Sequence, residues 1–265
     1  MSNLIASAGT LVDNGNGTWA YTPVLNDDTS VSFSYDISDG TLTIAGSATM
    51  DITPVNDAPT TSPVTLAAIA EDSGPRLITD AELLANASDA DGDTLTVSNL
   101  IASAGTLVDN GNGTWTYTPV VDDDSSVSFS YDISDGTVTI AGSASMDITP
   151  VNDTPTTSPV TLAAIAEDSG ARLITDAELL ANANDIDGDT LTVSNLIASA
   201  GTLVDNGNGT WTYTPALNDD TSVSFGYDIS DGTVSIAGSA SMDITPVNDA
   251  PTTSPVTLAA IAEDS

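Results

Sequence analysis

Three aspartates within five residues carry the clearest chemical signal in the sequence. Asp89, Asp91 and Asp93 form an Asp-x-Asp-Gly-Asp segment. The same segment returns later in the chain as Asp185, Asp187 and Asp189. Alternate carboxylates converge on one point where the backbone curls, and the glycine in the segment permits the curl. Because Ca²⁺ prefers hard oxygen ligands, this spacing predicts a calcium site. An ordinary polar turn is the alternative interpretation.

The charge of the whole chain also favours cation binding. Its 265 residues include 38 Asp plus Glu, 2 Lys plus Arg and no His, which gives a formal net charge of −36. The two basic side chains are Arg76 and Arg172. Such a surface repels nucleic acid and anionic membranes, and it repels itself unless cations bind. We therefore expect no nucleic-acid partner. Solubility or salt adaptation is the alternative explanation of the charge.

The residues that are missing exclude several functions. Cys, His and Lys are absent, so disulfides, thiolate metal sites, imidazole catalysis and Schiff bases are all excluded. A carboxylate pair would be the only acid–base machinery, and the sequence indicates no apolar cleft that would raise a carboxyl pKa. We therefore expect no enzyme. No apolar run approaches the roughly 20 residues that span a bilayer, so we expect no membrane insertion. The first residues lack a basic n-region, and a secretion signal is expected outside this chain.

The chain is an array of nearly identical repeats. The string NLIASAGTLVDNGNGTW begins at Asn3, Asn99 and Asn195, which sets a period of 96 residues. A period of that length is typical of a small domain with its own core. The predicted divisions are the C-terminal part of a repeat at 1–53, complete repeats at 54–149 and 150–245, and the start of a further repeat at 246–265. The two complete repeats differ at about ten positions.

Alternating apolar and polar residues predict short strands in each repeat. In the first complete repeat six segments qualify: 64–70, 94–97, 105–108, 114–118, 127–133 and 138–148. Two Asn-Gly pairs between the third and fourth segments predict a hairpin. Repeats that run end to end require an odd number of reversing strands, so we expect seven, with one segment split. The last segment contains Ala141-Gly142-Ser143, where a break is expected.

One short helix is expected between the first and second of these strands. Thr79 is a candidate N-cap, and Glu82 completes a capping box for a helix over 80–87. Trp115 and Tyr117 share one face of a strand and should lie in the core. The predicted fold class is all-β: tandem antiparallel β-sandwiches with one short helix per repeat.

Each repeat joins the next through a proline-flanked segment. ITPVNDAP occupies 52–59 and 244–251, and ITPVNDTP occupies 148–155. The two prolines stiffen the junction, and the Asn-Asp pair between them supplies oxygen ligands. Asn152 and Asp153 alone cannot satisfy Ca²⁺, which takes 6–8 oxygens.

The other junction ligands must therefore come from elsewhere in the chain. The candidates are Glu71 and Asp72 after the first strand, and the turn acids Asp132 and Asp135. If Glu71 completes the junction site, its carboxylate and that of Asp153 should lie within one coordination shell. Asp89 to Asp93 should lie near the same end of the repeat or form a separate site.

Three further patterns have simpler explanations. The acidic run Asp122-Asp123-Asp124 is expected to be a solvated loop, because the other repeat has Asn218 at its first position. Asn112-Gly113-Thr114 matches a glycosylation sequon, but a tight turn explains the same residues. A flat, ice-binding threonine array would need a much shorter repeat than this one.

The ordered motifs together resemble a known family. These motifs are AEDSG, LITDAELLANASDADGDTLTV, GTWTYTP, VSFSYDISDGTVTIAG and ITPVNDAP. They are similar to the bacterial cadherin-like (Ig-like) tandem repeats of giant RTX-type and biofilm-associated adhesins, and the resemblance covers essentially the whole chain. The resemblance implies Ig-like or cadherin-like Greek-key β-sandwiches that bind calcium. Its implied ligands are the Glu after the first strand, the Asp-x-Asp-Gly-Asp acids and the Val-Asn-Asp linker. Cadherin linkers carry a richer acidic pattern, so one or two calcium ions per junction are expected here.

The candidate Ca²⁺ ligands fall into equivalent sets along the chain. They are Glu71, Asp89, Asp91, Asp93, Asp135, Asn152, Asp153, Glu167, Asp185, Asp187, Asp189, Asp231, Asn248 and Asp249. The expected function is a structural extender in a large secreted adhesin at the bacterial cell surface, which supports cell adhesion and biofilm formation. Its expected partners are adjacent repeats of the same chain, and host or surface ligands reached through domains outside this fragment. The alternative is a multivalent glycan- or protein-binding repeat module.

Overall fold

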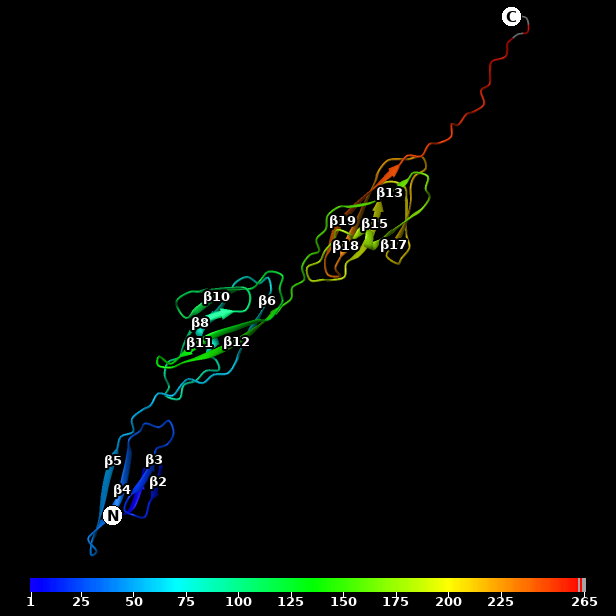
Figure 1. Cartoon of the computed structure of the whole chain (residues 1–265). Helices are drawn as coiled ribbons and strands as arrows, with labels where there is room; N and C mark the ends of the chain where they lie inside the picture. The colour runs from blue at the N-terminus through cyan, green and yellow to red at the C-terminus, as the bar shows by residue number, and fades with distance from the viewer. Residues whose placement is uncertain (262, 264–265) are drawn as a thin grey trace. The chain divides into compact units, whose positions relative to one another are not determined.

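The computed structural model describes residues 1–261 and 263, and the chain forms two compact units. The first unit is Met1–Val151 and the second is Asn152–Ser265. Each unit contains one complete β-sandwich (Figure 1). No helix among the described residues is long and apolar enough to cross a membrane.

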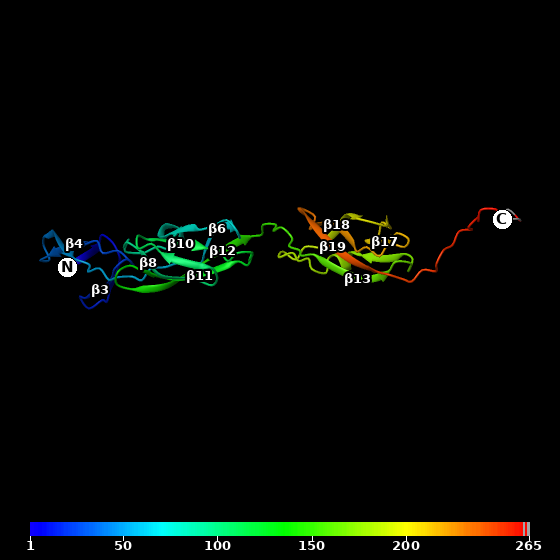
Figure 2. The same ribbon diagram turned by 90° about the horizontal axis from the view of Figure 1, so that it is seen from above.

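The complete sandwich of the first unit has seven strands and one helical turn. They are β6 (Val64–Ala70), β7 (Arg76–Thr79), α1 (Asp80–Leu83), β8 (Thr96–Ala102), β9 (Thr106–Asp109), β10 (Thr114–Thr118), β11 (Val127–Ser134) and β12 (Thr139–Thr149). One sheet has the order β6-β12-β11-β8 and the other β7-β10-β9. Strands β6 and β12 lie side by side and pair in parallel, while the other pairs are antiparallel (Figure 2). The predicted all-β sandwich is confirmed.

The expected count of seven strands is confirmed, but the expected split is wrong. Strand β12 runs unbroken through Gly142, which pairs with Tyr131 of β11. A Cβ atom on Gly142 would lie 2.4 Å from the Tyr131 ring, so the glycine makes room for the ring and does not end the strand. The seventh strand is instead β7, a four-residue segment before the helix. Its shortness hid it from a search for alternating residues.

The capping box at the start of α1 is confirmed, but the helix is shorter than expected. The Thr79 side chain accepts a hydrogen bond from the Glu82 backbone, and the Glu82 carboxylate accepts from the Thr79 backbone N–H at 2.9 Å. The helix ends at Leu83. Three residues later Asn86 donates to the carbonyl of Pro63 at 2.8 Å. This contact with the linker helps to turn the chain out of the helix.

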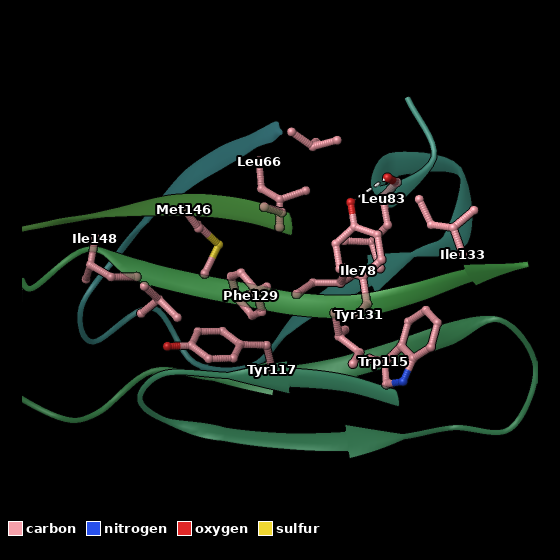
Figure 3. Packing of buried hydrophobic residues seen from close by; sticks show 14 residues of the cluster. Leu66, Ile78, Leu83, Trp115, Tyr117, Phe129, Tyr131, Ile133, Met146 and Ile148 are labelled. Carbon is pink, nitrogen blue, oxygen red and sulfur yellow. Dashed lines mark hydrogen bonds between the residues drawn. The ribbon is translucent and has the colours of Figure 1, made fainter. Parts of the chain in front are cut away.

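The core lies between the two sheets, as Figure 3 shows. Trp115 and Tyr117 of β10 both point inward, as predicted, with 5% and 0% of their surface exposed. Tyr117 packs edge-to-face against Phe129, with ring centroids 5.4 Å apart. The Tyr131 hydroxyl donates to the carbonyl of Leu83 at 2.8 Å, which joins α1 to the sheet (Figure 3).

The two buried tyrosines of this core should differ in how substitution by phenylalanine changes the stability of the fold. Tyr131→Phe leaves the buried Leu83 carbonyl without that donor, so we expect the free energy of unfolding to fall by about 1–3 kcal/mol. The Tyr117 hydroxyl is buried and has no hydrogen-bond partner among the described residues. Tyr117→Phe should therefore leave stability unchanged or raise it. Urea unfolding of both variants measures the difference, and equal destabilisation would contradict this interpretation. Tyr227→Phe and Tyr213→Phe repeat the comparison in the second unit.

The second unit repeats the same sandwich. Its elements are β13 (Val160–Ala166), β14 (Arg172–Thr175), α2 (Asp176–Leu179), β15 (Thr192–Ala198), β16 (Thr202–Asp205), β17 (Thr210–Thr214), β18 (Val223–Ser230) and β19 (Ser235–Thr245). The sheet orders are β13-β19-β18-β15 and β14-β17-β16. Its buried cluster contains the equivalents of the same fourteen residues.

The first 53 residues form only part of this architecture. They hold β1 (Ser2–Ala6), β2 (Thr10–Asp13), β3 (Trp19–Thr22), β4 (Val31–Ser38) and β5 (Thr43–Met50). Residues 1–53 contain no counterpart of β6, β7 or α1. As a result Ile37 is 46% exposed, whereas its equivalent Ile133 is fully buried. At the other end of the chain, residues 246–261 form no strand; three residues of the further repeat expected over 246–265 (262, 264 and 265) lie outside the described residues.

Candidate metal-binding sites

The Asp-x-Asp-Gly-Asp loop of the first unit brings three carboxylates together. Oxygen atoms of Asp89, Asp91 and Asp93 all lie within 4.8 Å of one another. The loop is held in this curl because Asp89 Oδ1 accepts hydrogen bonds from the backbone N–H groups of Asp91 at 2.9 Å and Asp93 at 3.2 Å. Gly92 has a φ of +79°, a left-handed conformation that suits glycine.

The second oxygen of Asp89 makes this cluster suited to a cation. Asp89 Oδ2 is buried and has no hydrogen-bond partner among the described residues. The basic side chain of this unit, Arg76, is ion-paired with Glu82 at 2.8 Å and is not available to neutralise the loop. A buried carboxylate oxygen without a donor costs free energy unless a proton or a cation satisfies it. Hard carboxylate oxygens at this spacing fit Ca²⁺, and further oxygens would complete its shell.

The second unit has the same arrangement. Asp185 Oδ1 accepts from the backbone of Asp187 at 3.0 Å and from that of Asp189 at 3.3 Å. The three carboxylates again lie within 4.8 Å of one another, and Asp185 Oδ2 is buried without a hydrogen-bond partner among the described residues. Ile186 stands where the first unit has Ala90, so the geometry does not depend on the residue between the aspartates.

The linker segment that precedes each repeat docks onto that repeat. In the first unit the Asp57 backbone N–H donates to Asp91 Oδ2 at 2.6 Å, and Asn56 Nδ2 donates to Asp135 Oδ2 at 3.0 Å. These contacts place the linker's Asn-Asp pair beside both the acidic loop and the turn before β12. Asn56 and Asp57 are absent from the candidate ligands predicted from the sequence. The first copy of the ITPVNDAP segment, which contains them, is the signal that could have found them.

The second unit reproduces the docking with four predicted residues. Asn152 Nδ2 donates to Asp231 Oδ2 at 3.1 Å, and the Asp153 backbone N–H donates to Asp187 Oδ2 at 2.7 Å. The structure thus gathers the linker pair, one acid of the Asp-x-Asp-Gly-Asp loop and the turn acid within one unit. All of them are oxygen-bearing side chains, which is the donor set Ca²⁺ prefers.

The turn acid has a lowered pKa in both units. The backbone N–H of Val138, together with the Asn56 amide and the backbone N–H of Thr137, holds the pKa of Asp135 below its ordinary 3.8. In the second unit Val234 and Asn152 lower the pKa of Asp231 in the same way. These bonds favour the ionised form, so the turn and the linker contact are strongest when the carboxylate is charged.

A pH dependence of stability follows from this shift. Because the folded-state pKa is depressed, the stabilisation is present above about pH 4 and is lost as the pH falls through the folded-state pKa. We expect the calcium-free chain to lose thermal stability over that acidic window, and the Asp135→Asn, Asp231→Asn double variant to lose less. Melting temperatures measured against pH test this expectation. Burial raises the pKa of Asp80, with the Asp109 charge adding to it, so Asp80→Asn should change the profile with the opposite sign.

The glutamate after the first strand lies at the other end of its repeat. Glu71 is 3% exposed; its N–H donates to the Thr149 carbonyl, and its Oε1 accepts from the Val151 N–H at 2.7 Å. Thr149 ends β12, whereas Asp135 lies just before β12 begins, so Glu71 and Asp135 of one repeat do not share a site. Asp153 belongs to the second unit, so its joint coordination with Glu71 stays a prediction.

In the second unit the equivalent glutamate binds the residue that precedes the next linker pair. Glu167 Oε1 accepts from the Val247 N–H at 2.6 Å, directly before Asn248 and Asp249. The Asn248 amide donates to the Asp249 carbonyl at 3.1 Å, the same local bond that Asn152 makes with Asp153. The glutamate therefore anchors the start of the linker in each complete repeat.

Two other predicted acids have separate roles. Asp132 accepts from Asn99 Nδ2 at 2.7 Å across the edge of the four-stranded sheet, so it supports the bulge in β8 and not the linker. Asp72 Oδ1 lies 3.5 Å from the Asp122 backbone nitrogen, at the limit of a hydrogen bond.

Comparison with known proteins gives one family match. The cadherin-like domain family matches residues 1–53, 55–149 and 151–245. No curated protein matches the chain. Among solved structures, the chain is similar to mouse protocadherin-24 EC1-3, with a TM-score of 0.53, 13% identity, and coverage of 92% of this chain and 90% of that one. It is similar to the protocadherin gamma B2 extracellular cadherin domains 1-5, with a TM-score of 0.53, 14% identity, and coverage of 93% and 53%.

The chain also aligns with an endo-fucoidan hydrolase of glycoside hydrolase family 107, with a TM-score of 0.29 and 20% identity. That alignment covers 93% of this chain and 39% of the hydrolase, so the chain spans well under half of its length. The family match, in contrast, extends over nearly every residue from 1 to 245 and falls on each repeat in turn. The chain belongs to the family of cadherin-like domains, which it carries as tandem repeats.

Proposed function

We propose that this chain is a calcium-rigidified extender segment of a large secreted bacterial surface adhesin. Its repeats hold an adhesive region away from the cell and support cell adhesion and biofilm formation. Calcium is bound within each repeat by the Asp-x-Asp-Gly-Asp loop and at each junction by the linker pair. Glu71 and Glu167 serve the junctions that follow their repeats. Cadherin-like domains generally bind calcium, which agrees with this assignment.

The observation that carries the proposal is the cluster at Asp89 and its copy at Asp185. Three carboxylates converge in each, and one buried oxygen in each has no hydrogen-bond partner among the described residues. The chain has two basic residues, and both are ion-paired with glutamates outside the loops. A divalent cation is the simplest species that balances this charge. Extracellular modules bind calcium with a Kd of roughly 10⁻⁴–10⁻³ M, which extracellular fluids saturate and cytosol does not.

The docking of the linker explains how calcium would stiffen the array. The Asp57 N–H donates to Asp91, and the Asp153 N–H donates to Asp187. A loop carboxylate that would bind calcium therefore also accepts a hydrogen bond from the linker. A cation on the loop would fix the carboxylates that hold the linker. Calcium occupancy and linker rigidity would then be coupled, because each favours the same loop conformation.

The rival function, a multivalent glycan- or protein-binding module, needs exposed recognition residues. The aromatic residues of the two complete repeats are all buried: Trp115, Tyr117, Phe129, Tyr131, Trp211, Tyr213, Phe225 and Tyr227. Stacking on a sugar requires an open aromatic face, which these residues do not offer. The buried aromatics therefore favour the extender.

Small-angle scattering tests the extender directly. At physiological salt, adding a chelator to the calcium-loaded chain should broaden the distribution of maximum dimensions, and restoring calcium should reverse the change. The Asp147→Ala, Asp243→Ala double variant is a matched control, since both aspartates are exposed on the sheet and lie outside the acidic loops. A scattering profile that chelation leaves unchanged in the wild-type chain would refute the proposal.

A further inference from the structure

Each repeat contains a hairpin turn with two Asn-Gly pairs in succession. The asparagines are Asn14, Asn16, Asn110, Asn112, Asn206 and Asn208. Asparagine before glycine can react with its own backbone, because glycine has no side chain to shield its nitrogen. The glycine nitrogen bonds to the asparagine Cγ, the Cγ–Nδ2 bond breaks, and ammonia leaves with the backbone proton. Water then opens the resulting succinimide to aspartate or isoaspartate, with no change in oxidation state.

The first asparagine of the turn is held away from this reaction. Asn110 Nδ2 donates to Thr114 Oγ1 at 3.0 Å and to Thr116 Oγ1 at 3.2 Å, and its Oδ1 accepts from Thr116 at 3.3 Å. The attacking atom, the Gly111 nitrogen, is also restrained, because its N–H donates to Asp109 Oδ1 at 2.8 Å. Attack would require breaking the side-chain bonds and the backbone bond together.

The second asparagine has none of these restraints on its reacting atoms. Asn112 is exposed, and within the described part of the chain neither its Nδ2 nor the Gly113 N–H donates a hydrogen bond. Its side-chain Oδ1 accepts a hydrogen bond from Thr114 Oγ1 at 2.7 Å. A donor at that oxygen stabilises the negative charge that develops there as the nitrogen attacks Cγ. Because Asn110 Oδ1 also has such a donor, the two asparagines differ at Nδ2 and at the glycine N–H.

We propose that the second asparagine of each hairpin, at Asn16, Asn112 and Asn208, is a site of spontaneous deamidation, whereas the fold protects Asn110 and Asn206. The second unit has the same pattern. Asn206 Nδ2 donates to two threonines, and the Gly207 N–H donates to Asp205 at 2.8 Å, while Asn208 Oδ1 accepts from Thr210 Oγ1. The repeats thus provide independent copies of one reactive site and one protected site.

A sequence difference between the repeats predicts an intermediate deamidation rate at Asn14. In the first repeat Ala20 stands where Thr116 stands in the next. Asn14 therefore keeps one threonine contact, to Thr18 at 3.0 Å, and Gly15 keeps its bond to Asp13. The reaction rate of Asn14 should lie between those of Asn110 and Asn112.

The modification would act on the contact between the hairpin and the helix. The Asp80 N–H donates to the Gly113 carbonyl at 3.0 Å, which fastens the turn to the start of α1. Deamidation adds a carboxylate directly before Gly113, and isoaspartate also adds a carbon to the backbone there. Both changes disturb this hydrogen bond and add negative charge near Asp80 and Asp109. Each deamidation therefore adds one more negative charge that bound cations must balance in an already acidic repeat.

Peptide mapping of the aged chain tests the proposal. The folded chain is incubated in mildly alkaline water enriched in heavy oxygen, cut with an acid-specific protease, and fragmented to separate aspartate from isoaspartate. Asn112 and Asn208 should take up heavy oxygen at least about tenfold faster than Asn110 and Asn206, the effect of one intact hydrogen bond to a charged group. In denaturant the difference should disappear.

The Thr116→Ala, Thr212→Ala variant provides the matched test, because Ala20 shows that a repeat accepts alanine at this position. It should raise the rates at Asn110 and Asn206 to that of Asn14. Equal rates at the first and second asparagines of the folded wild-type chain would overturn the proposal. So would an unreactive Asn112 in the folded chain under conditions where the denatured chain reacts.

Discussion

Saturating calcium is expected to raise the melting temperature of this chain by roughly 10–20 °C over the chelated state. A ligand that binds only the folded state stabilises it by about 2.7 kcal/mol when its concentration is a hundred times Kd. One site per repeat suffices for that gain. The physical source is the replacement of repulsion among Asp89, Asp91 and Asp93 by shared coordination of a cation. Differential scanning calorimetry with and without chelator measures the shift.

Substitutions in the loop show whether the rise in melting temperature comes from calcium bound at a site or from general screening of charge by ions. The Asp89→Ala, Asp185→Ala variant removes the buried oxygens and should lose most of the calcium-dependent shift. The Asp147→Ala, Asp243→Ala control removes the same formal charge from the sheet surface and should keep it. Sodium at matched ionic strength should not replace calcium in the wild-type chain. An equal shift in both variants would show that screening, and not a site, is responsible.

Phe129→Ala is expected to give the largest loss from a single side chain. Phe129 is 2% exposed and packs edge-to-face against Tyr117 at 5.4 Å. Removing the ring leaves a cavity between the two sheets, and we expect the repeat 54–149 to lose about 3–5 kcal/mol of stability. This estimate includes the lost edge-to-face interaction between Phe129 and Tyr117.

Hydrogen exchange read by mass spectrometry assigns this loss to one repeat. Each complete repeat has its own buried cluster, so amides of 54–149 should exchange faster while those of 160–245 keep their protection. Phe225→Ala should give the reverse pattern. Loss of protection in both repeats from either substitution would mean that they unfold as one cooperative body. An array of independent repeats predicts the local result.

Local signals in the sequence predicted much of this fold. Alternation identified the strands at 64–70 and 114–118 because one inward face carries their apolar side chains. The Thr79–Glu82 capping box is a contact between residues three positions apart, so it too can be predicted locally. The parallel pairing of β6 with β12 joins residues about 80 positions apart and has no local signal. Strand β7 also lacks a local signal, because its four residues are too few to show alternation and its pairing with β10 defines it.

Identical residues in different contexts show the limit of local prediction most clearly. Val64–Ile69 and Val256–Ile261 have the same sequence, yet the first forms β6 with Val64 4% exposed and the second forms no strand with Val256 82% exposed. Strand β12 is present to pair with the first, and the described residues hold no such partner for the second. The candidate metal sites follow the same rule. The Asp89–Asp93 loop could be predicted from spacing, whereas the contact of Asn56 with Asp135 joins residues 79 positions apart.

Calorimetric titration of the decalcified chain with calcium tests the central claim most directly. We predict saturable binding with a Kd of roughly 10⁻⁴–10⁻³ M and at least one ion for each complete repeat. The Asp89→Ala, Asp185→Ala variant should lose at least the two loop sites, and the Asp147→Ala, Asp243→Ala control should bind as the wild-type chain does. Absence of saturable binding, or binding that survives unchanged in the loop variant, would contradict the assignment of calcium to these loops.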